Sequence, residues 1–453
     1  MERLPSSASG NVIPLIVLAG LLGTTACNGP ERDGDRMTLH GEAQGTTFNI
    51  KYIDPEHRDL TRPVDSLFRA VDAALSLWDP NSTVSRFNAA TDTFVTDDAL
   101  FLDVLGYARA DWVLTAGAFD PTVYPLVKAW GFGPQGEAVA NTSQNDSLRH
   151  LVGLSMIFSD PPVSPPGSAH GTMKLWKRFP GIQFDPNGIA QGYTVDRIAE
   201  RLESEGIHSY MVEVGGEVRA HGTNATDEPW SIGIDKPEAG SDHDLQTTIS
   251  LKDASIATSG NYRKFREVNG QRVGHTIDPR TGKPVTHGLL SVSVLHRMCT
   301  SADALATGLL VMGPDATFTW STAHPDIGIF LVLDDGMGGY LTWASKKWPG
   351  EAQFRDERPT YPADTTAVQD AERPMPSEDP ASTRDGVGLP MDNGMKGGLN
   401  EMKQLTEEEK MQIKRDKRKA SMSPLERQKL ERLEKEEELL REKQQRLKEE
   451  GAH

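Results

Sequence analysis

Cysteine is almost absent from this chain: among 453 residues, only Cys27 and Cys299 occur. Two cysteines cannot build a disulfide framework, and no cluster of histidine and cysteine has the spacing of a zinc site. A basic surplus is also missing, because the formal net charge is −17. That balance excludes nucleic acid as the main partner, since phosphate backbones are bound by basic surfaces. We interpret Cys299 as a buried or half-buried thiol without a functional role.

Hydrophobic residues are scarce as well, at 37% of the chain with a mean hydropathy of −0.48. The length would allow two or three domains, or one large domain with appendages. Because a wholly globular protein usually has more apolar residues, we expect part of the chain to be solvated.

The N-terminus carries a short apolar run, "NVIPLIVLAGLLGTTAC". It is too short for a comfortable membrane span and fits the hydrophobic region of a secretory signal. A cysteine directly after "GTTA" is similar to a bacterial lipobox, which predicts export and a lipid on Cys27 at the periplasmic side of a bacterial membrane. Two features depart from that pattern: Thr24 replaces the usual aliphatic residue, and Arg3 is the only basic residue before the run. The alternatives are an uncleaved anchor or a chance apolar N-terminus.

Composition divides the chain into five regions. We expect a signal and lipobox over 1–27, a flexible tether over 28–39, a globular domain over 40–348, a disordered linker over 349–400 and a charged helical tail over 401–453. The linker is rich in proline and acidic residues and poor in aliphatic ones, so it cannot offset its ordering entropy. In the tail, leucines recur every seven residues, but Glu437 and Gln444 occupy the intermediate positions of the seam. This pattern is typical of a solvated or weak partner-binding helix rather than a strong coiled coil.

The globular region mixes strand and helix patterns. Residues 46–53, 210–222 and 230–235 are predicted strands, and 64–78, 103–117, 194–206 and 300–313 have helical periodicity. Because these elements do not alternate as regular βαβ units, we predict an α+β fold.

The helical stretch "TSADALATGLLVMG" (300–313) carries polar residues in an apolar run. Asp303 and Thr307 are four residues apart and therefore share one helix face. One explanation is a helix start, with Ser301 as the N-cap and Asp303 favoured by the helix dipole. The other is a metal or phosphate site. The stretch alone leaves both open.

Four further stretches combine turn residues with polar or glycine positions. They are "GAFDPTVYPLVKAWGF" with Asp120, "FDPNGIAQGYTVD" with Asp185, "VEVGGEVRAHG", and "HTIDPRTGKP" with His275, Asp278 and Arg280. A turn or a helix cap explains each of them separately, and so does a ligand held by backbone groups at a helix start. Any metal bound here would be a hard cation with oxygen ligands, such as magnesium.

In this order the stretches resemble the FAD:protein FMN transferase family, also called the ApbE or thiamine-biosynthesis lipoprotein family. The resemblance runs from about residue 41 to 344 and includes "QGTTFNI", "SLWDPNSTVSRFN" and "IATSGNYRKF". Its specific part is "HTIDPRTGKP" followed by "SADALATGLLVMG". The resemblance implies mixed, largely antiparallel sheets flanked by helices, and it makes 40–348 the flavin transferase domain.

The resemblance also implies a set of site residues. Mg²⁺ would be held by Asp303, Thr307 and the backbone carbonyl of Gly188, and His275 would lie beside the pyrophosphate of FAD. We expect His275 and Asp303 to act in catalysis. The implied flavin contacts are Gln44, Trp78, Ala118, Phe119, Asp120, Asp185, Gln191 and Ile277.

Two of these residues depart from the family pattern. Gln44 stands where methionine is common, and Gln191 in "GIAQG" replaces the lysine of "GIAKG". Loss of that lysine puts affinity for the phosphates in doubt rather than the type of reaction.

The implied reaction transfers the FMN part of FAD to a Thr or Ser hydroxyl of an exported flavoprotein and releases AMP. Acceptors in the family are subunits of sodium-pumping NADH:quinone reductase, Rnf-type complexes and related flavoproteins. Two alternatives stay open: a Mg²⁺-dependent FAD pyrophosphatase that gives FMN and AMP, and a non-catalytic flavin-binding or scaffold lipoprotein.

Overall fold

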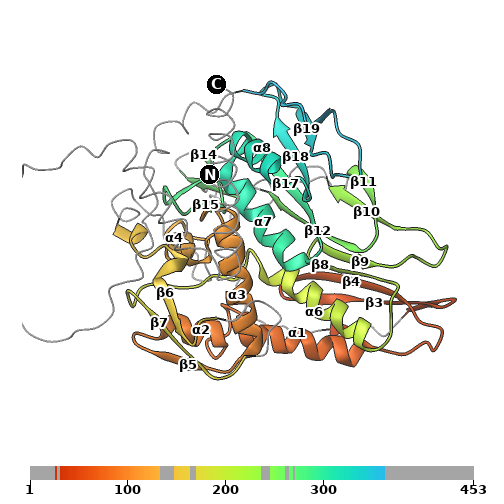
Figure 1. Ribbon diagram of the computed structural model, residues 1–453, viewed down its shortest axis with the longest axis horizontal. Helices are drawn as coiled ribbons and strands as arrows, with labels where there is room; N and C mark the ends of the chain where they lie inside the picture. The colour runs from red at the N-terminus through yellow and green to blue at the C-terminus, as the bar shows by residue number, and fades with distance from the viewer. Residues whose placement is uncertain are drawn as a thin grey trace, which may run out of the picture. The chain divides into compact units, whose positions relative to one another are not determined.

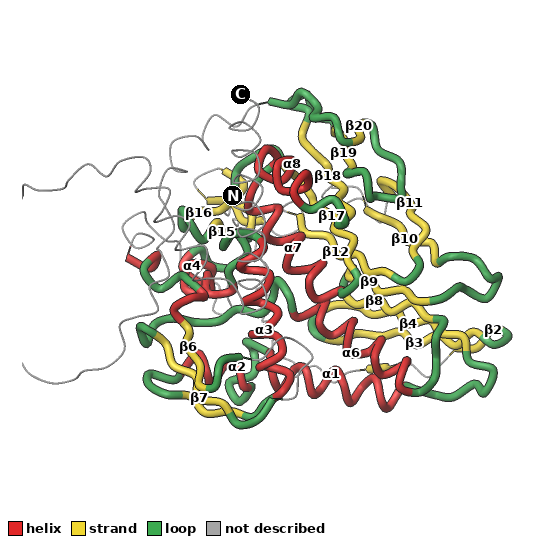
Figure 2. The backbone as a smooth tube through the Cα atoms, viewed as in Figure 1, coloured by secondary structure: helices red, strands yellow, loops and turns green. Residues whose placement is uncertain are grey.

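The computed structural model describes residues 26–27, 31–132, 147–163, 170–235, 245–260, 265–268 and 271–362 (Figure 1). Figure 2 shows how helices, strands and loops follow one another along this part of the chain. The helices are α1 (Thr61–Leu75), α2 (Thr83–Ala89), α3 (Ala99–Leu114), α4 (Tyr124–Ala129), α6 (Ala190–Ser204), α7 (Cys299–Met312) and α8 (Pro314–Ala323), with 3-10 turns at Pro121–Val123 and Leu154–Met156.

The largest element is an eleven-stranded sheet in which neighbouring strands run antiparallel except for the last pair. Its order is β1 (Ala26–Cys27), β3 (Arg36–Ala43), β4 (Thr46–Ile53), β8 (Tyr210–Val214), β9 (Glu217–His221), β12 (Ala254–Gly260), β17 (Leu289–His296), β18 (Gly328–Asp334), β19 (Tyr340–Ala344) and β20 (Phe354–Arg355), with β2 (Glu31–Asp33) beside β3. The smaller sheets are β5 (Phe94–Thr96), β7 (Met173–Lys177) and β6 (Ile157–Asp160); β10 (Trp230–Asp235) and β11 (Leu245–Leu251); β13 (Phe265–Val268) and β14 (Gln271–Gly274); and β15 (Ile277–Asp278) and β16 (Lys283–Pro284).

Both faces of the large sheet are covered, and β18 shows how. Its residues from Gly328 to Leu333 are buried and carry no polar side chain, as expected for a strand covered on both sides. Ile329 and Leu331 pack in the core under α7 and α8, whereas Phe330 and Val332 pack in the core under β10 and β11. The alternation of side chains along a strand thus divides one continuous apolar run between two cores.

A further core lies around α3, between α2 and the small sheet β5–β7–β6. Ala304 of α7 belongs to this core, while Ala302 and Leu305 belong to the core against the large sheet. Helix α7 therefore lies between the two, as Figure 1 shows. Polar residues on α7 are consequently buried unless they face a space between these layers.

Helices α6 and α7 pack closely because glycine occupies their contact. A Cβ atom at Gly192 would lie 2.4 Å from the carbonyl oxygen of Cys299 and 2.9 Å from the Cβ of Asp303. Backbone cannot move away from such a contact cheaply, so the absence of a side chain here sets the distance between the two helices.

The α+β fold with largely antiparallel sheets is confirmed. The strand predicted over 46–53 coincides with β4, and the predicted helices correspond to α1, α3, α6 and α7. Helix α6 is followed by Gly206 at φ +79°, the left-handed conformation that glycine commonly adopts just after a helix C-terminus.

Ordered structure extends beyond the predicted limits of the domain at both ends. Strand β3 begins at Arg36, inside the region expected to be a tether, and Met37 and Leu39 are buried. After residue 348, β20 pairs in parallel with β19, and the Tyr361 hydroxyl donates to Asp315. The tether over 31–39 and the disordered linker over 349–362 are therefore wrong predictions, because pairing of β2 with β3, pairing of β20 with β19 and the contact with α8 order these segments. The predictions for 1–25, 28–30 and 363–453 lie outside the described residues.

Within the described ranges, no helix combines the length and the apolar character that crossing a membrane would require.

Candidate functional site

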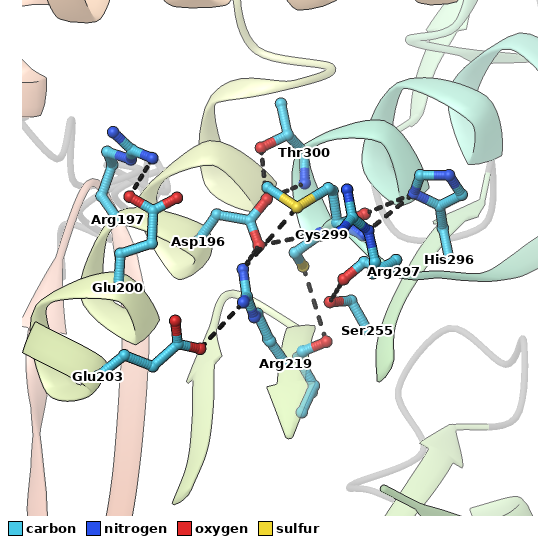
Figure 3. Close-up of polar contacts among 12 residues, drawn as sticks. Asp196, Arg197, Glu200, Glu203, Arg219, Ser255, His296, Arg297, Cys299 and Thr300 are labelled. Atoms are coloured by element: carbon cyan, nitrogen blue, oxygen red, sulfur yellow. Dashed lines mark hydrogen bonds and ion pairs between the residues drawn. The ribbon is translucent and has the colours of Figure 1, made fainter. Parts of the chain in front are cut away.

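The start of α7 is held by a carboxylate from α6 (Figure 3). Asp196 accepts hydrogen bonds from the backbone N–H of Cys299 (3.1 Å), the N–H of Thr300 (2.9 Å) and the hydroxyl of Thr300 (2.6 Å). The first backbone N–H groups of a helix have no acceptor within the helix, and Asp196 supplies the acceptor for two of them. The N-cap residue itself is Met298, whose side chain forms no capping bond. The prediction that Ser301 is the N-cap is therefore wrong, since Ser301 lies within the first turn.

The charge of Asp196 is balanced by Arg219 from β9. The guanidinium contacts Asp196 at 2.8 Å and Glu203 of α6 at 3.1 Å. Burial alone would lower the pKa of Arg219, but the hydrogen bond and charge of Asp196 raise it above its ordinary range. Figure 3 shows this network around Cys299, a buried thiol whose pKa is raised by burial. The network fixes α7 to both α6 and the sheet.

One turn further along α7, Asp303 is 5% exposed. Its Oδ2 accepts a hydrogen bond from the N–H of Gly192 at 3.1 Å. Burial raises the pKa of Asp303 to about 7, and the Gly192 bond only partly opposes that effect. The carboxylate would therefore be stabilised by a cation at neutral pH.

Thr307 is the accessible polar residue of α7: the helix is otherwise buried apart from Met312. Its hydroxyl lies 3.0 Å from the hydroxyl of Ser259 in β12. A Cβ atom at Gly188 would lie 3.3 Å from the Thr307 oxygen and 3.3 Å from the ring of Phe119. The backbone at Gly188 therefore lies close to Thr307 on α7.

The 118–120 segment lies on the other side of that turn. Ala118 and Phe119 are buried, and the Phe119 N–H donates to the Thr115 hydroxyl at 3.1 Å. Asp120 is turned into the protein, where its carboxylate accepts bonds from Trp112, Thr122 and the Leu154 N–H. Burial raises the pKa of Asp120 despite these donors. The carboxylate is thus occupied in holding the segment, and contact with a ligand would come from neighbouring atoms.

Asp185 joins this segment to α6. Its N–H donates to the carbonyl of Pro121 at 2.7 Å, and its carboxylate accepts the N–H of Asn187 at 2.9 Å. Burial raises the pKa of Asp185 to about 6. The residue shapes the turn that presents Gly188 to α7.

Of the two glutamines that depart from the family pattern, Gln191 lies in the first turn of α6, and Gln44 lies in the turn between β3 and β4 with its side chain against α6. Gln44, at φ +53°, accepts from the Thr194 hydroxyl at 3.1 Å and also bonds to Asp72. Gln191 reaches the turn after β8, where a Cβ atom at Gly215 would lie 2.3 Å from its Nε2. The Gln44 carboxamide is therefore held by α6 and α1, whereas that of Gln191 occupies the space that a side chain at position 215 would fill.

The remaining predicted residues are placed by other contacts. Trp78 follows α1 and is 72% exposed, so its indole is free to stack on a ligand. The ring of His275 packs edge-on against Phe132, with centroids 6.4 Å apart. Ile277 is buried in β15. That hairpin is tied to the end of α7 through Arg280, which pairs with Asp278 and reaches the Val311 carbonyl at 3.5 Å.

One acid beside Asp303 was missed by sequence reasoning. Asp111 of α3 is 3% exposed and receives a hydrogen bond from Ser301 of α7. Burial raises its pKa to about 8, and the charge of Asp303 adds to the shift. The sequence did contain a signal for Asp111: in "DWVLT" (111–115) an aspartate precedes a threonine by four residues, as in "DALAT" (303–307).

The donor set fits a hard cation. A carboxylate, an aliphatic hydroxyl and a backbone turn meet on one face of α7, and such oxygen donors suit Mg²⁺. The described residues contain no group of three or more His, Cys, Asp or Glu side chains placed to hold a metal. A site here would therefore depend on the hydroxyl, the backbone and the substrate to complete its ligands.

A family model decides the classification: the ApbE family matches residues 44–331. The chain belongs to the ApbE family. The resemblance seen in the motifs is thereby confirmed.

Proteins similar in sequence align with this chain over most of their length. An FAD:protein FMN transferase of Vibrio cholerae is 36% identical over 342 residues, covering 73% of this chain and 97% of the relative. The enzyme of the same name from Haemophilus influenzae is 34% identical over 340 residues, covering 73% and 95%. Among solved structures, the flavin transferase ApbE of V. cholerae superposes with a TM-score of 0.60 at 34% identity, covering 70% of this chain and 99% of that one. The apo flavinyl transferase ApbE of Pseudomonas stutzeri gives 0.59 at 31%, covering 71% and 96%.

Replacing Asp196 tests how α7 is held. We expect Asp196→Ala to lower the free energy of unfolding by about 3–5 kcal/mol, because Arg219 and the first N–H groups of α7 lose a buried partner. Urea unfolding followed by circular dichroism measures this change. The control is Arg201→Ala, which removes an exposed ion pair with Glu205 on the same helix and should cost less than about 1 kcal/mol. Equal effects of the two variants would refute the role of Asp196.

Proposed function

We propose that this protein is an FAD:protein FMN transferase. A Thr or Ser hydroxyl of an acceptor protein attacks the phosphorus of the FMN half of FAD. The new oxygen–phosphorus bond forms as the pyrophosphate bond breaks, the hydroxyl proton leaves, and AMP departs. The proposal extends to exported acceptors, such as subunits of sodium-pumping NADH:quinone reductase or Rnf-type complexes.

The observation that carries the proposal is the shared face of Asp303 and Thr307. It lies opposite the backbone of Gly188 and beside Phe119, in a chain whose relatives bear the name of this activity. Buried oxygen donors beside a helix-start turn suit a phosphate group with its counter-cation.

We assign Mg²⁺ to the Asp303 carboxylate, the Thr307 hydroxyl and the backbone of Gly188. When bound there, Mg²⁺ would neutralise charge on the phosphate oxygens. Ser259 orients the Thr307 hydroxyl, and the Gly192 N–H fixes one oxygen of Asp303. These contacts hold the donors in position before substrate arrives, which lowers the cost of organising the site.

Other residues position the remainder of FAD. The exposed indole of Trp78 offers a flat apolar surface to an aromatic ring. Gln44 and Gln191 supply neutral carboxamides where the family commonly has methionine and lysine. His275 would assist proton or charge movement near the pyrophosphate.

Asp303→Ala tests the cation site. We expect transfer of flavin to an acceptor domain to fall by at least about 100-fold, because the only carboxylate on this face of α7 is lost. The assay incubates full-length protein with FAD, Mg²⁺ and acceptor, and follows flavin fluorescence on the acceptor band together with AMP release. Asp326→Ala, which removes an exposed acid, is the control and should retain activity.

The same assay distinguishes other functions. Fluorescence on the acceptor supports transfer, whereas FMN and AMP free in solution would identify a pyrophosphatase. No turnover of FAD under any condition would support a flavin-binding scaffold. Undiminished transfer by Asp303→Ala would overturn the cation assignment alone.

His275→Ala tests the histidine. We expect transfer to slow by about 10²- to 10⁴-fold, the usual effect of losing a group that moves protons, and the pH–rate profile to flatten. Rates are measured between pH 5.5 and 9 with saturating FAD. The exposed His150 serves as a matched control through His150→Ala. A slower rate with an unchanged pH profile would indicate that His275 only positions the substrate.

We also propose that the protein is exported and carries a lipid on Cys27 at the periplasmic face of the membrane. Intact mass spectrometry of the mature protein from a bacterial membrane fraction should show cleavage before Cys27 and the added mass of acyl chains. Cys27→Ala should release the protein into the soluble fraction. An uncleaved or unmodified N-terminus would exclude the lipid.

A further inference from the structure

Helix α4 connects two stretches that belong to the proposed FAD site. The indole N–H of Trp130 donates to the carbonyl of Gly282 at 2.9 Å, in the β15–β16 hairpin. The ammonium of Lys128 donates to the side-chain oxygen of Gln183 at 2.5 Å, on the segment that enters the 185–188 turn. The helix is therefore tied on one side to the hairpin and on the other side to the segment before this turn.

The residues before and after α4 contact the site directly. The N–H of Asp185 donates to the carbonyl of Pro121 at 2.7 Å, and a Cβ atom at Gly188 would lie 3.3 Å from the ring of Phe119. Beyond α4, Phe132 packs against the ring of His275. Helix α4 thus lies between the segment that contacts the Gly188 turn and the residue that contacts His275.

Lys128 has no acidic partner among the described residues. Its ammonium lies 4.8 Å from the centre of the Tyr124 ring, and its hydrogen bond goes to the neutral amide of Gln183. The side chain is half-buried, so burial lowers the pKa of Lys128, and no acid of the described chain raises it. A partly desolvated cation without a counter-charge is costly, and an anion in contact with it would remove that cost.

Neighbouring basic residues have partners on the protein. Arg280 pairs with Asp278 at 2.9 Å, and the guanidinium of Arg149 donates to the backbone carbonyl of Arg280. Gln191, where lysine is common in the family, carries no charge. Lys128 therefore offers a positive charge that Gln191 does not supply.

We propose that Lys128 binds a phosphate oxygen of FAD and supplies the positive charge missing at Gln191. The inference rests on the proposed function, because it takes FAD as the substrate. An ammonium has three N–H donors, so the bond to Gln183 can persist while a second donor reaches the pyrophosphate. Gln183 and the Tyr124 ring then hold the ammonium in position before FAD binds.

Three variants separate the charge of Lys128 from its packing. Lys128→Met removes the ammonium and keeps an unbranched side chain, whereas Lys128→Arg keeps the charge. The matched control is Lys174→Met, which removes an exposed lysine of β7. Full-length protein with MgCl2 is titrated with FAD by isothermal titration calorimetry at low and high KCl. The shift of Tm on addition of FAD provides a second readout.

We expect Lys128→Met to raise the Kd for FAD by about 10- to 100-fold, because a charge-assisted hydrogen bond to phosphate is lost. Lys128→Arg should stay within about 3-fold of the parent, since arginine also binds phosphate. Lys174→Met should match the parent. Raising KCl from about 50 to about 300 mM should weaken FAD binding more in the parent than in Lys128→Met, because salt screens a contact that the variant lacks.

An unchanged Kd for FAD in Lys128→Met would overturn the inference. So would a loss of affinity that Lys128→Arg shares in full, or the same salt dependence in the parent and in Lys128→Met, because a packing role predicts these results. If the parent itself binds no FAD, the proposed function fails and this inference fails with it. Binding by the parent with an unaffected Lys128→Met refutes the role of Lys128 alone.

Discussion

The bond between the Asp196 carboxylate and the first turn of α7 is the contact on which the site depends. Asp196 belongs to α6, whose first residues follow the Gly188 turn, and α7 carries Asp303 and Thr307. One carboxylate thus fixes the distance between the two halves of the cation face, while Arg219 prevents it from being an uncompensated buried charge. A displacement of about 1 Å between α6 and α7 would separate oxygen donors that must act together.

Close packing makes this arrangement possible and also makes it costly. Glycines at 188, 192 and 308 allow α6, α3 and α7 to approach without side chains between them. The approach places acids where water has little access, and their raised pKa values follow from that burial. A cation or a substrate can compensate for such a site, so stability and function are coupled at this point.

Sequence patterns were sufficient to predict the main helices and strands and the face of α7 that carries Asp303 and Thr307. The alternation of buried and exposed residues predicted β4, and the four-residue spacing of Asp303 and Thr307 predicted that they share a helix face. The cap of α7 could not be predicted, because its acceptor lies more than 100 residues away in Asp196. Asp111 was not predicted for a similar reason, since only the packing of α3 on α7 distinguishes it from an acidic residue on the exposed face of a helix. Motifs predicted that Asp120 belongs to the segment, but not that its carboxylate is used internally.

The pairing of β3 and β20 at the ends of the domain has a consequence for anyone who wishes to shorten the chain. The family match spans 44–331, but β3, β19 and β20 lie outside it and β18 lies only partly inside it. A fragment cut at those limits would leave the backbone groups of β4 and β18 without their outer neighbours. Exposed apolar strand edges pair with other chains, so such a fragment would tend to aggregate, whereas a fragment that begins at Ala26 and ends at Pro362 would keep the strands that cover β4 and β18.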